Sequence, residues 1–113
     1  MKTFTRVELI GYVGNDPEIK EFENSKVARF SIATSESYKD RNGNKVESTY
    51  FHNLVAWNKL AEISEKYVKT GLPMFVEGRL KNNSWEDEEG KKRYTTEIVV
   101  DKLIFLDKKD KSK

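Results

Sequence analysis

The chain has 113 residues, 36% of them hydrophobic and 35% charged, which predicts one domain with a single modest core. The absence of cysteine excludes disulfides, thiolate nucleophiles and thiolate-bound zinc, and the polar N-terminus without a long apolar window excludes a signal peptide or membrane span, so we expect a cytoplasmic protein. The net charge of +2 is carried by the final stretch DKKDKSK, so a nucleic-acid site would have to be a local basic patch.

The first half of the chain predicts strands separated by turn residues. Apolar residues over 4–13 predict a strand closed by Gly14, and Asn15-Asp16-Pro17 predicts a turn. A short strand over 19–22 and a long strand over 26–38 follow, the latter rich in β-branched and aromatic residues. The small polar run 34–37 predicts a bulge or bend that re-aims Tyr38.

The middle of the chain predicts a hairpin, then a strand that continues directly into a helix. Asn42-Gly43 predicts a type I′ turn, which needs positive φ at both central positions. The strand starting at Tyr50 ends at Asn58, which is expected to cap the helix. Apolar residues recur at helical spacing up to Tyr67, and Gly71 ends the helix.

The last part of the chain predicts two more strands joined by a polar arm. Residues 74–80 predict a strand, 82–92 a hairpin arm with its turn near Glu89-Gly90, and 94–106 a final strand in two parts. The tail at 107–113 is expected to be flexible, which leaves one domain over residues 1–106. Five main strands with a helix between the third and fourth match an all-β OB-fold, a five-stranded Greek-key barrel.

The stretch YFHNLVAWNKLAE at 50–62 carries the functional hypothesis. Alternation places Phe51 and Trp57 on one strand face and Leu54 and Ala56 on the other, and both faces are largely apolar. One face can pack inward, and the other then presents its aromatics to a partner, with Lys59 close by. Exposed aromatics beside cations are typical of surfaces that stack bases and hold phosphates. Core packing is the alternative for each aromatic taken singly.

Five stretches in this order and spacing resemble the bacterial single-stranded DNA-binding protein family. They are GYVGNDPEI, VARFSIATSESY, YFHNLVAWNKLAE, the strand VEGRL at 76–80, and RYTTEIVV. The resemblance covers the chain from about residue 6 to residue 106. It implies an OB-fold that binds single-stranded DNA without sequence preference and performs no catalysis during replication, recombination or repair.

The resemblance also implies the site residues. Bases would stack on aromatics at four positions, and phosphates would be neutralised by cations at four others. The aromatics are Tyr38, Phe51, Trp57 and Trp85, and the cations are Arg6, Lys59, Lys69 and Lys81. Relatives usually carry more basic residues before the last aromatic, whereas this chain has NNS before it and EDEE after it. We therefore expect the arm at 82–92 to hold DNA less strongly than is usual in the family.

His52 matches a histidine that lies at a contact between subunits in the family, whose working unit is generally a homotetramer. A single histidine without cysteines makes no plausible metal site, so no cofactor or metal is expected. Family members commonly continue into an acidic tip that recruits replication and repair proteins. This sequence stops at DKKDKSK, which leaves that recruitment open.

Two other functions are alternatives to DNA binding. The fold could serve as a protein-interaction accessory of replication restart or conjugation, a role for which the missing acidic tip and the acidic arm leave room. A hydrolase would need a carboxylate pair such as Asp16 and Glu18 in a pocket. Those two residues instead flank a proline in a predicted turn, so we do not expect an enzyme.

Overall fold

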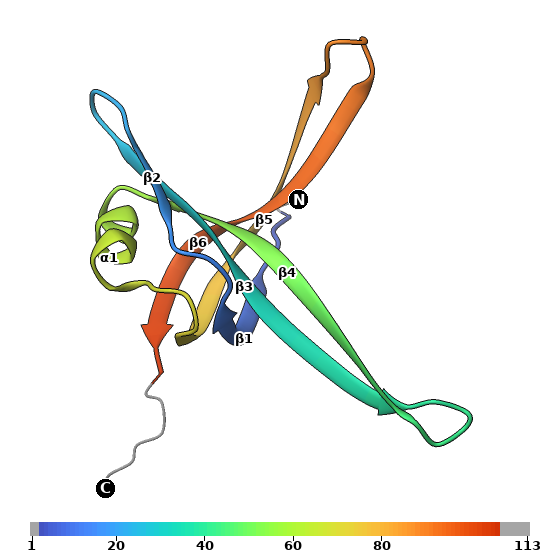
Figure 1. Cartoon of the computed structure of the whole chain (residues 1–113). Coiled ribbons are helices and arrows are strands. Elements are labelled where there is room, and N and C mark those ends of the chain that lie inside the picture. The colour runs from blue at the N-terminus through green and yellow to red at the C-terminus, as the bar shows by residue number, and fades with distance from the viewer. Residues whose placement is uncertain (1–2, 107–113) are drawn as a thin grey trace, which may run out of the picture.

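The computed structural model describes residues 3–106, which form six strands and one helix (Figure 1). In chain order the elements are β1 (Val7–Val13), β2 (Glu18–Glu21), β3 (Lys26–Lys39), β4 (Lys45–Trp57), α1 (Lys59–Tyr67), β5 (Pro73–Glu86) and β6 (Lys92–Phe105). The flexible tail expected at 107–113 lies outside the described residues. No helix within 3–106 is long and apolar enough to cross a membrane.

Five of the strands close into a barrel. β1 pairs with β5 on one side and with β3 on the other, so the ring runs β1-β5-β6-β4-β3 and returns to β1, while β2 pairs with β3 alone. α1 lies between the third and fourth barrel strands in chain order. The predicted five-stranded OB-fold is therefore confirmed. The prediction that the final strand is in two parts is wrong, because β6 is continuous. Its pairing with β5 has one register shift, opposite Glu77 and Gly78.

The core is built by strand alternation. On β3 and β4 the even-numbered residues point inward, and α1 covers one end of the barrel with a narrow face that includes Ala61 and the buried Ser64. The fully buried apolar residues include Ala28, Ile32, Leu54, Ala56, Ala61, Met74 and Val76. Tyr67, at the end of the apolar spacing in the helix, is 57% exposed, because α1 packs against the core through Leu60 and Ala61.

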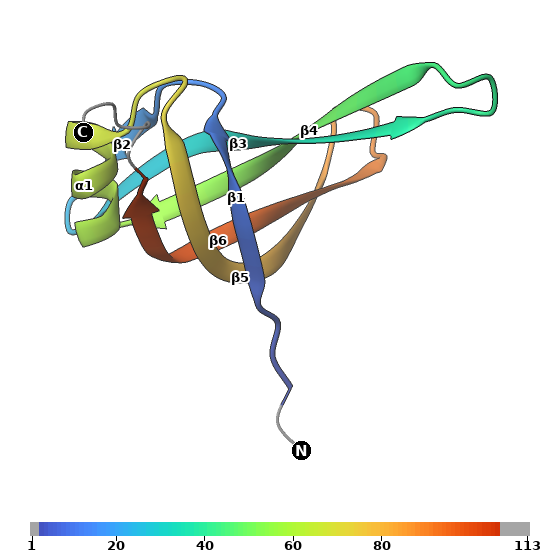
Figure 2. The same cartoon turned by 90° about the horizontal axis from the view of Figure 1, so that it is seen from below.

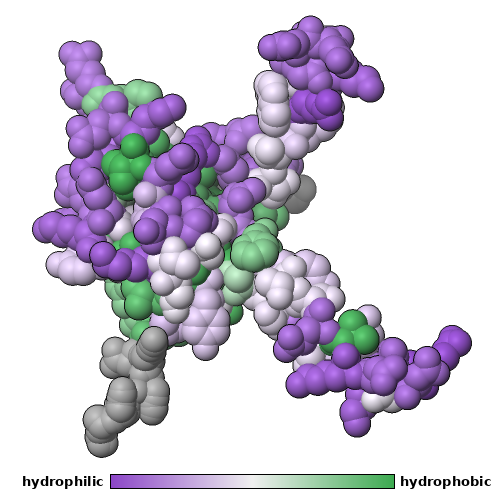
Figure 3. Space-filling model, viewed as in Figure 1, coloured by the Kyte–Doolittle hydropathy of each residue, from purple (hydrophilic) through white to green (hydrophobic). Residues whose placement is uncertain are grey.

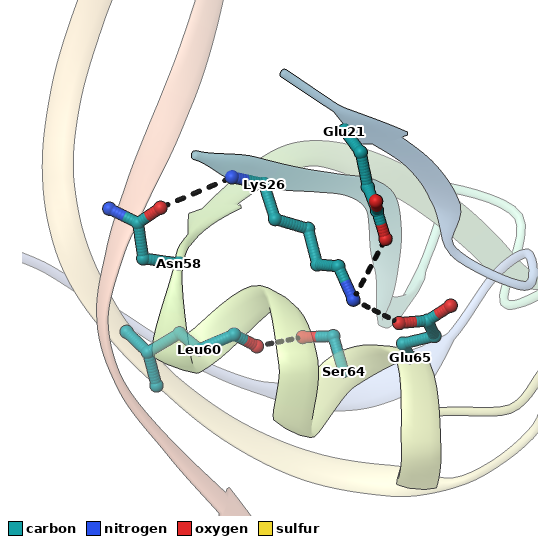
Figure 4. A network of polar contacts seen from close by, with 6 residues as sticks. All are labelled: Glu21, Lys26, Asn58, Leu60, Ser64 and Glu65. Carbon is teal, nitrogen blue, oxygen red and sulfur yellow. Dashed lines mark hydrogen bonds and ion pairs between the residues drawn. The ribbon is translucent and has the colours of Figure 1, made fainter. Parts of the chain in front are cut away.

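The start of α1 differs from the prediction. Asn58 occupies the N-cap position with a positive φ of 53°, but its side chain does not cap the helix. Its Oδ1 instead accepts a hydrogen bond from the backbone N–H of Lys26 at 3.1 Å (Figure 4). The ammonium of Lys26 contacts Glu65 of α1 at 2.7 Å and Glu21 of β2 at 3.4 Å. These contacts raise the pKa of Lys26, the hydrogen bond with Glu65 being the main cause, and they attach α1 to the sheet.

Two long hairpins extend beyond the barrel as arms (Figure 1). In the β3–β4 arm pairing runs without a break from Val27↔Trp57 to Lys39↔Lys45, so the bulge predicted at 34–37 is absent. Small polar residues are compatible with a regular two-stranded ribbon, and nothing forces an extra residue into one strand. In Figure 2 both arms extend to the same side, away from α1.

Both arms end in the same five-residue turn, D-x-x-G-x. In the first, the carboxylate of Asp40 accepts the backbone N–H groups of Asn42 and Asn44, each at 2.9 Å, and only Gly43 has positive φ. In the second, Asp87 accepts the N–H groups of Glu89 and Lys91 at the same distance. The predicted hairpin at 42–43 is therefore present, but its turn is not type I′, because the aspartate holds a longer loop closed.

Candidate nucleic-acid interface

The odd-numbered residues of β4 form the centre of an outward face. Phe51 is 64% exposed and Trp57 is 41% exposed, whereas Leu54 and Ala56 on the opposite face are buried. The unbroken register of β3 and β4 places the two aromatics on the same side. Val55 between them is buried, where β6 runs beside β4 in a short parallel pairing. The predicted division of this strand into an inward and an outward side is thus present.

Trp57 borders a hollow of about 580 Å³, which we call the Trp57 hollow. Its other walls come from β5, β6 and the segment before β1: Thr3, Phe4, Thr5, Arg79, Leu80, Lys81 and Val99. The guanidinium of Arg79 donates two hydrogen bonds to Asp101, both at 3.1 Å, and remains more than half exposed. Lys81 has no ion-pair partner within residues 3–106, so its charge is available to a ligand.

Phe51 borders a second hollow of about 340 Å³, which we call the Phe51 hollow. Arg29 of β3 and Glu97 of β6 lie in it as an ion pair, and Glu97 also accepts a hydrogen bond from Asn83 at 2.9 Å. Glu97 is mostly buried, whereas Arg29 is half exposed. Arg29 was not among the predicted site residues. The sequence feature that could have identified Arg29 is the alternation of β3, which places it on the same face as Ser31 and away from the core.

The end of β1 supports the ring of Phe51. A Cβ at Gly14 would lie 2.7 Å from the hydroxyl of Ser31 and 3.2 Å from that ring, so only glycine leaves room here. Asn15 fixes the same corner, because its Oδ1 accepts hydrogen bonds from the N–H of Ser31 at 3.0 Å and from its hydroxyl at 2.6 Å. The GYVGN stretch therefore shapes the Phe51 hollow.

Trp85 lies near the end of the β5–β6 arm and is 49% exposed. Strand alternation places it on the same side of β5 as Lys81 and Asn83. Of the acidic residues beyond it, Asp87 accepts hydrogen bonds from the turn and from Arg93 at 2.9 Å, which lower its pKa, the backbone N–H of Lys91 being the main cause. One of the four acidic charges is therefore engaged by the arm itself. Figure 3 shows that the ends of both arms are hydrophilic.

The structure separates the remaining predicted residues from this face. Tyr38 pairs with Val46 and lies on the opposite side of the β3–β4 arm from Phe51. Arg6 precedes β1 and contacts Glu77 at 3.7 Å, whereas Lys69 follows α1, beside Asp16 at the other end of β1. Lys59 borders a hollow with glutamates at positions 21, 23 and 62. Of the four predicted cations, only Lys81 lies in a hollow beside a predicted aromatic.

His52 is half-buried on the side of β4 opposite Phe51. Its Nε2 lies 2.9 Å from the hydroxyl of Thr34. Among the residues the structure describes, no three histidine, cysteine, aspartate or glutamate side chains are grouped as a metal ion would require.

The chain is similar to known proteins over nearly its whole length. The model of the single-strand binding protein family matches residues 4–106. The chain is 47% identical over 107 residues to a protein of Chlorobaculum tepidum named single-stranded DNA-binding protein 1, covering 93% of this chain and 66% of the relative. A protein of the same name from Xylella fastidiosa is 40% identical over 111 residues, which cover 96% of this chain and 82% of the relative.

A solved structure has the same fold. It is a Plasmodium falciparum SSB in complex with single-stranded DNA, and it matches with a TM-score of 0.86 and 33% sequence identity. The match covers 95% of this chain and 98% of that chain. The match therefore extends over nearly the whole of both chains.

Proposed function

The chain belongs to the single-strand binding protein family, and we propose that it coats single-stranded DNA without sequence preference. Bases stack on Trp57 and Phe51, while Lys81 and the exposed parts of Arg79 and Arg29 contact phosphates. Such coating protects single strands and keeps them unpaired during replication, recombination or repair. No catalytic step is involved, and we place the activity in the cytoplasm.

The observation that carries this proposal is the pair of exposed aromatics on one strand face. Trp57 lies six positions after Phe51, a distance of about 20 Å along an extended strand. Each ring borders a hollow that also contains an arginine, so each offers a flat apolar surface beside a positive charge. A single strand can supply bases and phosphates to both at once, whereas the bases of a duplex are already stacked on one another.

The position of Tyr38 sets a condition on the path of the DNA. Because it lies on the opposite side of the β3–β4 arm from Phe51, a strand that contacts both rings must pass around that arm. We therefore propose that Trp57 and Phe51 form the central contacts and that Tyr38 and Trp85 contact longer strands. Arg6, Lys59 and Lys69 would then contribute at the periphery.

Fluorescence titration tests the proposal directly, since Trp57 and Trp85 are the only tryptophans in the chain. We expect an unstructured thymine oligonucleotide to quench their fluorescence, raised salt to weaken the binding, and the matching duplex to have little effect. Unchanged fluorescence together with an unchanged sedimentation coefficient would refute DNA coating. The runner-up, an accessory that binds proteins through this fold, would then be favoured.

We also propose that the chain forms a homotetramer. Ile10, Phe75 and Ile104 are neighbours across β1, β5 and β6, and the two isoleucines are 65% and 44% exposed. Contiguous exposed apolar residues mark interaction surfaces, and we assign His52 to a contact between subunits as well. Sedimentation equilibrium should give four times the chain mass, and Ile10→Lys should reduce it. A wild-type monomer at micromolar concentration would contradict this assignment.

A further inference from the structure

The segment before β1 carries the most exposed large hydrophobic side chain among residues 3–106. Phe4 is 83% exposed and is not part of the buried core. Covering so exposed a phenylalanine with an apolar partner is favourable, because its ring is removed from water.

The position of Phe4 is fixed by the strand beside it. β1 pairs with β5 as far as Val7↔Gly78, and beyond that pair the hydroxyl of Thr5 accepts a hydrogen bond from the backbone N–H of Leu80 at 3.0 Å. This hydrogen bond holds Thr5 against β5 past the last ladder pair, and Figure 2 shows the segment before β1 then projecting from the barrel. Continuing this antiparallel alignment by one residue brings Phe4 beside Lys81.

Phe4 and Trp57 border the same hollow, although 53 positions separate them in the sequence. Arg79 and Lys81 form part of the wall around them. A hollow of about 580 Å³ is open enough to admit a nucleobase with its sugar and phosphate. The Trp57 hollow therefore combines the ring of Phe4, two cations and the ring of Trp57, to which we assign base stacking.

We propose that Phe4 is a further base-stacking residue, which extends the DNA path from Trp57 across β5 to the N-terminal segment. The inference rests on the proposed function, because it assigns a nucleotide to the same face. A base stacked on Phe4 covers its exposed ring, and the adjoining phosphate lies within reach of Lys81. Since stacking requires only a π-face, Phe4 adds affinity without adding sequence preference.

Phe4→Ala is the first test, with Phe22→Ala as the matched control. Phe22 is also exposed, at 52%, but it lies in the turn between β2 and β3, outside both the Trp57 and Phe51 hollows. Loss of one stacked base should weaken binding of a thymine oligonucleotide on the order of 5- to 150-fold. The salt dependence should stay as in the wild type, and Phe22→Ala should bind within about twofold of it.

A fluorescent probe at position 4 separates stacking from an indirect effect. In a chain that carries Trp57→Phe and Trp85→Phe, the substitution Phe4→Trp supplies the sole tryptophan, and a thymine oligonucleotide should quench it. Normal binding by Phe4→Ala, or an unquenched tryptophan at position 4 while the oligonucleotide remains bound, would overturn the proposal and leave the proposed function intact. Failure of the wild type to bind would refute both. Loss of oligomer mass in Phe4→Ala would show that Phe4 covers a protein contact instead.

Discussion

The Trp57 hollow allows the stacking and ionic contributions to binding to be measured separately. Trp57→Ala removes the ring, and Lys81→Gln removes the neighbouring charge while keeping a side chain of similar length. If both contact one nucleotide, the first change should weaken binding equally at all salt concentrations. The second should change how strongly binding depends on salt.

The expected loss for Trp57→Ala follows from its exposed surface. A tryptophan offers up to about 250 Å², so the 41% exposed fraction leaves about 100 Å² for a base to cover. At about 25 cal/mol per Å² this is worth up to about 2.5 kcal/mol. A base that covers only part of this area gives about 1 kcal/mol, so affinity should fall about 5- to 70-fold.

The assay is a fluorescence-anisotropy titration of a labelled thymine oligonucleotide at four salt concentrations. For Lys81→Gln the slope of log K against log salt should become shallower by about 0.7, the value for one phosphate on a single strand. Tyr67→Ala is the matched control, since Tyr67 is an exposed aromatic that packs edge-on against Phe105, away from the Trp57 hollow. A loss below twofold for Trp57→Ala, or a slope change equal to that of Lys81→Gln, would refute the reasoning.

Three further predictions concern stability. Gly11→Ala should lower the free energy of unfolding by about 1–3 kcal/mol, because its Cβ would lie 2.2 Å from the carbonyl oxygen of Ala33; a urea midpoint like that of the wild type would contradict this. Gly43→Ala should cost about 1–2 kcal/mol through its φ of +83°, with DNA affinity unchanged in the same titration. Glu65→Gln should lower the free energy of unfolding below about pH 10.4, where Lys26 is charged in both the folded and the unfolded state. The difference in stability from the wild type should vanish as the pH rises through the raised pKa of Lys26. Thermal melts over pH 7–12 check this, and a difference that persists at the highest pH would argue against the ion pair as its source.

The sequence predicts those features of the fold that depend on neighbours along the chain. Alternation on β4 separates Phe51 and Trp57 from Leu54 and Ala56, and glycine with polar residues locates both hairpin turns. The turn type was wrong because the Asp40 side chain, not the Asn-Gly pair alone, closes the loop. The prediction considered only the two central residues of the turn. It therefore did not include the side chain of Asp40, which accepts hydrogen bonds from two backbone N–H groups.

The parts of the site that were missed depend on strands distant in sequence. Phe4 reaches the Trp57 hollow because β1 pairs with β5, and the hydrogen bond that extends this pairing joins residues 75 positions apart. Arg29 meets Glu97 across β3 and β6, 68 positions apart. Lys59 is the opposite case, since it is close to Trp57 in sequence but begins a helix that carries it into an acidic hollow. Proximity along the chain therefore does not place Lys59 in the same hollow as Trp57.

Strand alternation also divides β4 into residues that stabilise the core and residues whose side chains are free to bind DNA. The barrel buries Leu54 and Ala56, while Phe51 and Trp57 on the same strand keep 64% and 41% of their surface exposed. Each exposed ring therefore contributes less to the core than a buried side chain would, and its loss leaves no enclosed cavity. Truncating either ring should cost far more in DNA affinity than in stability, whereas Leu54→Ala should do the reverse. Glu97 in turn contacts both Arg29 and Asn83, and these contacts hold the wall of the Phe51 hollow in place.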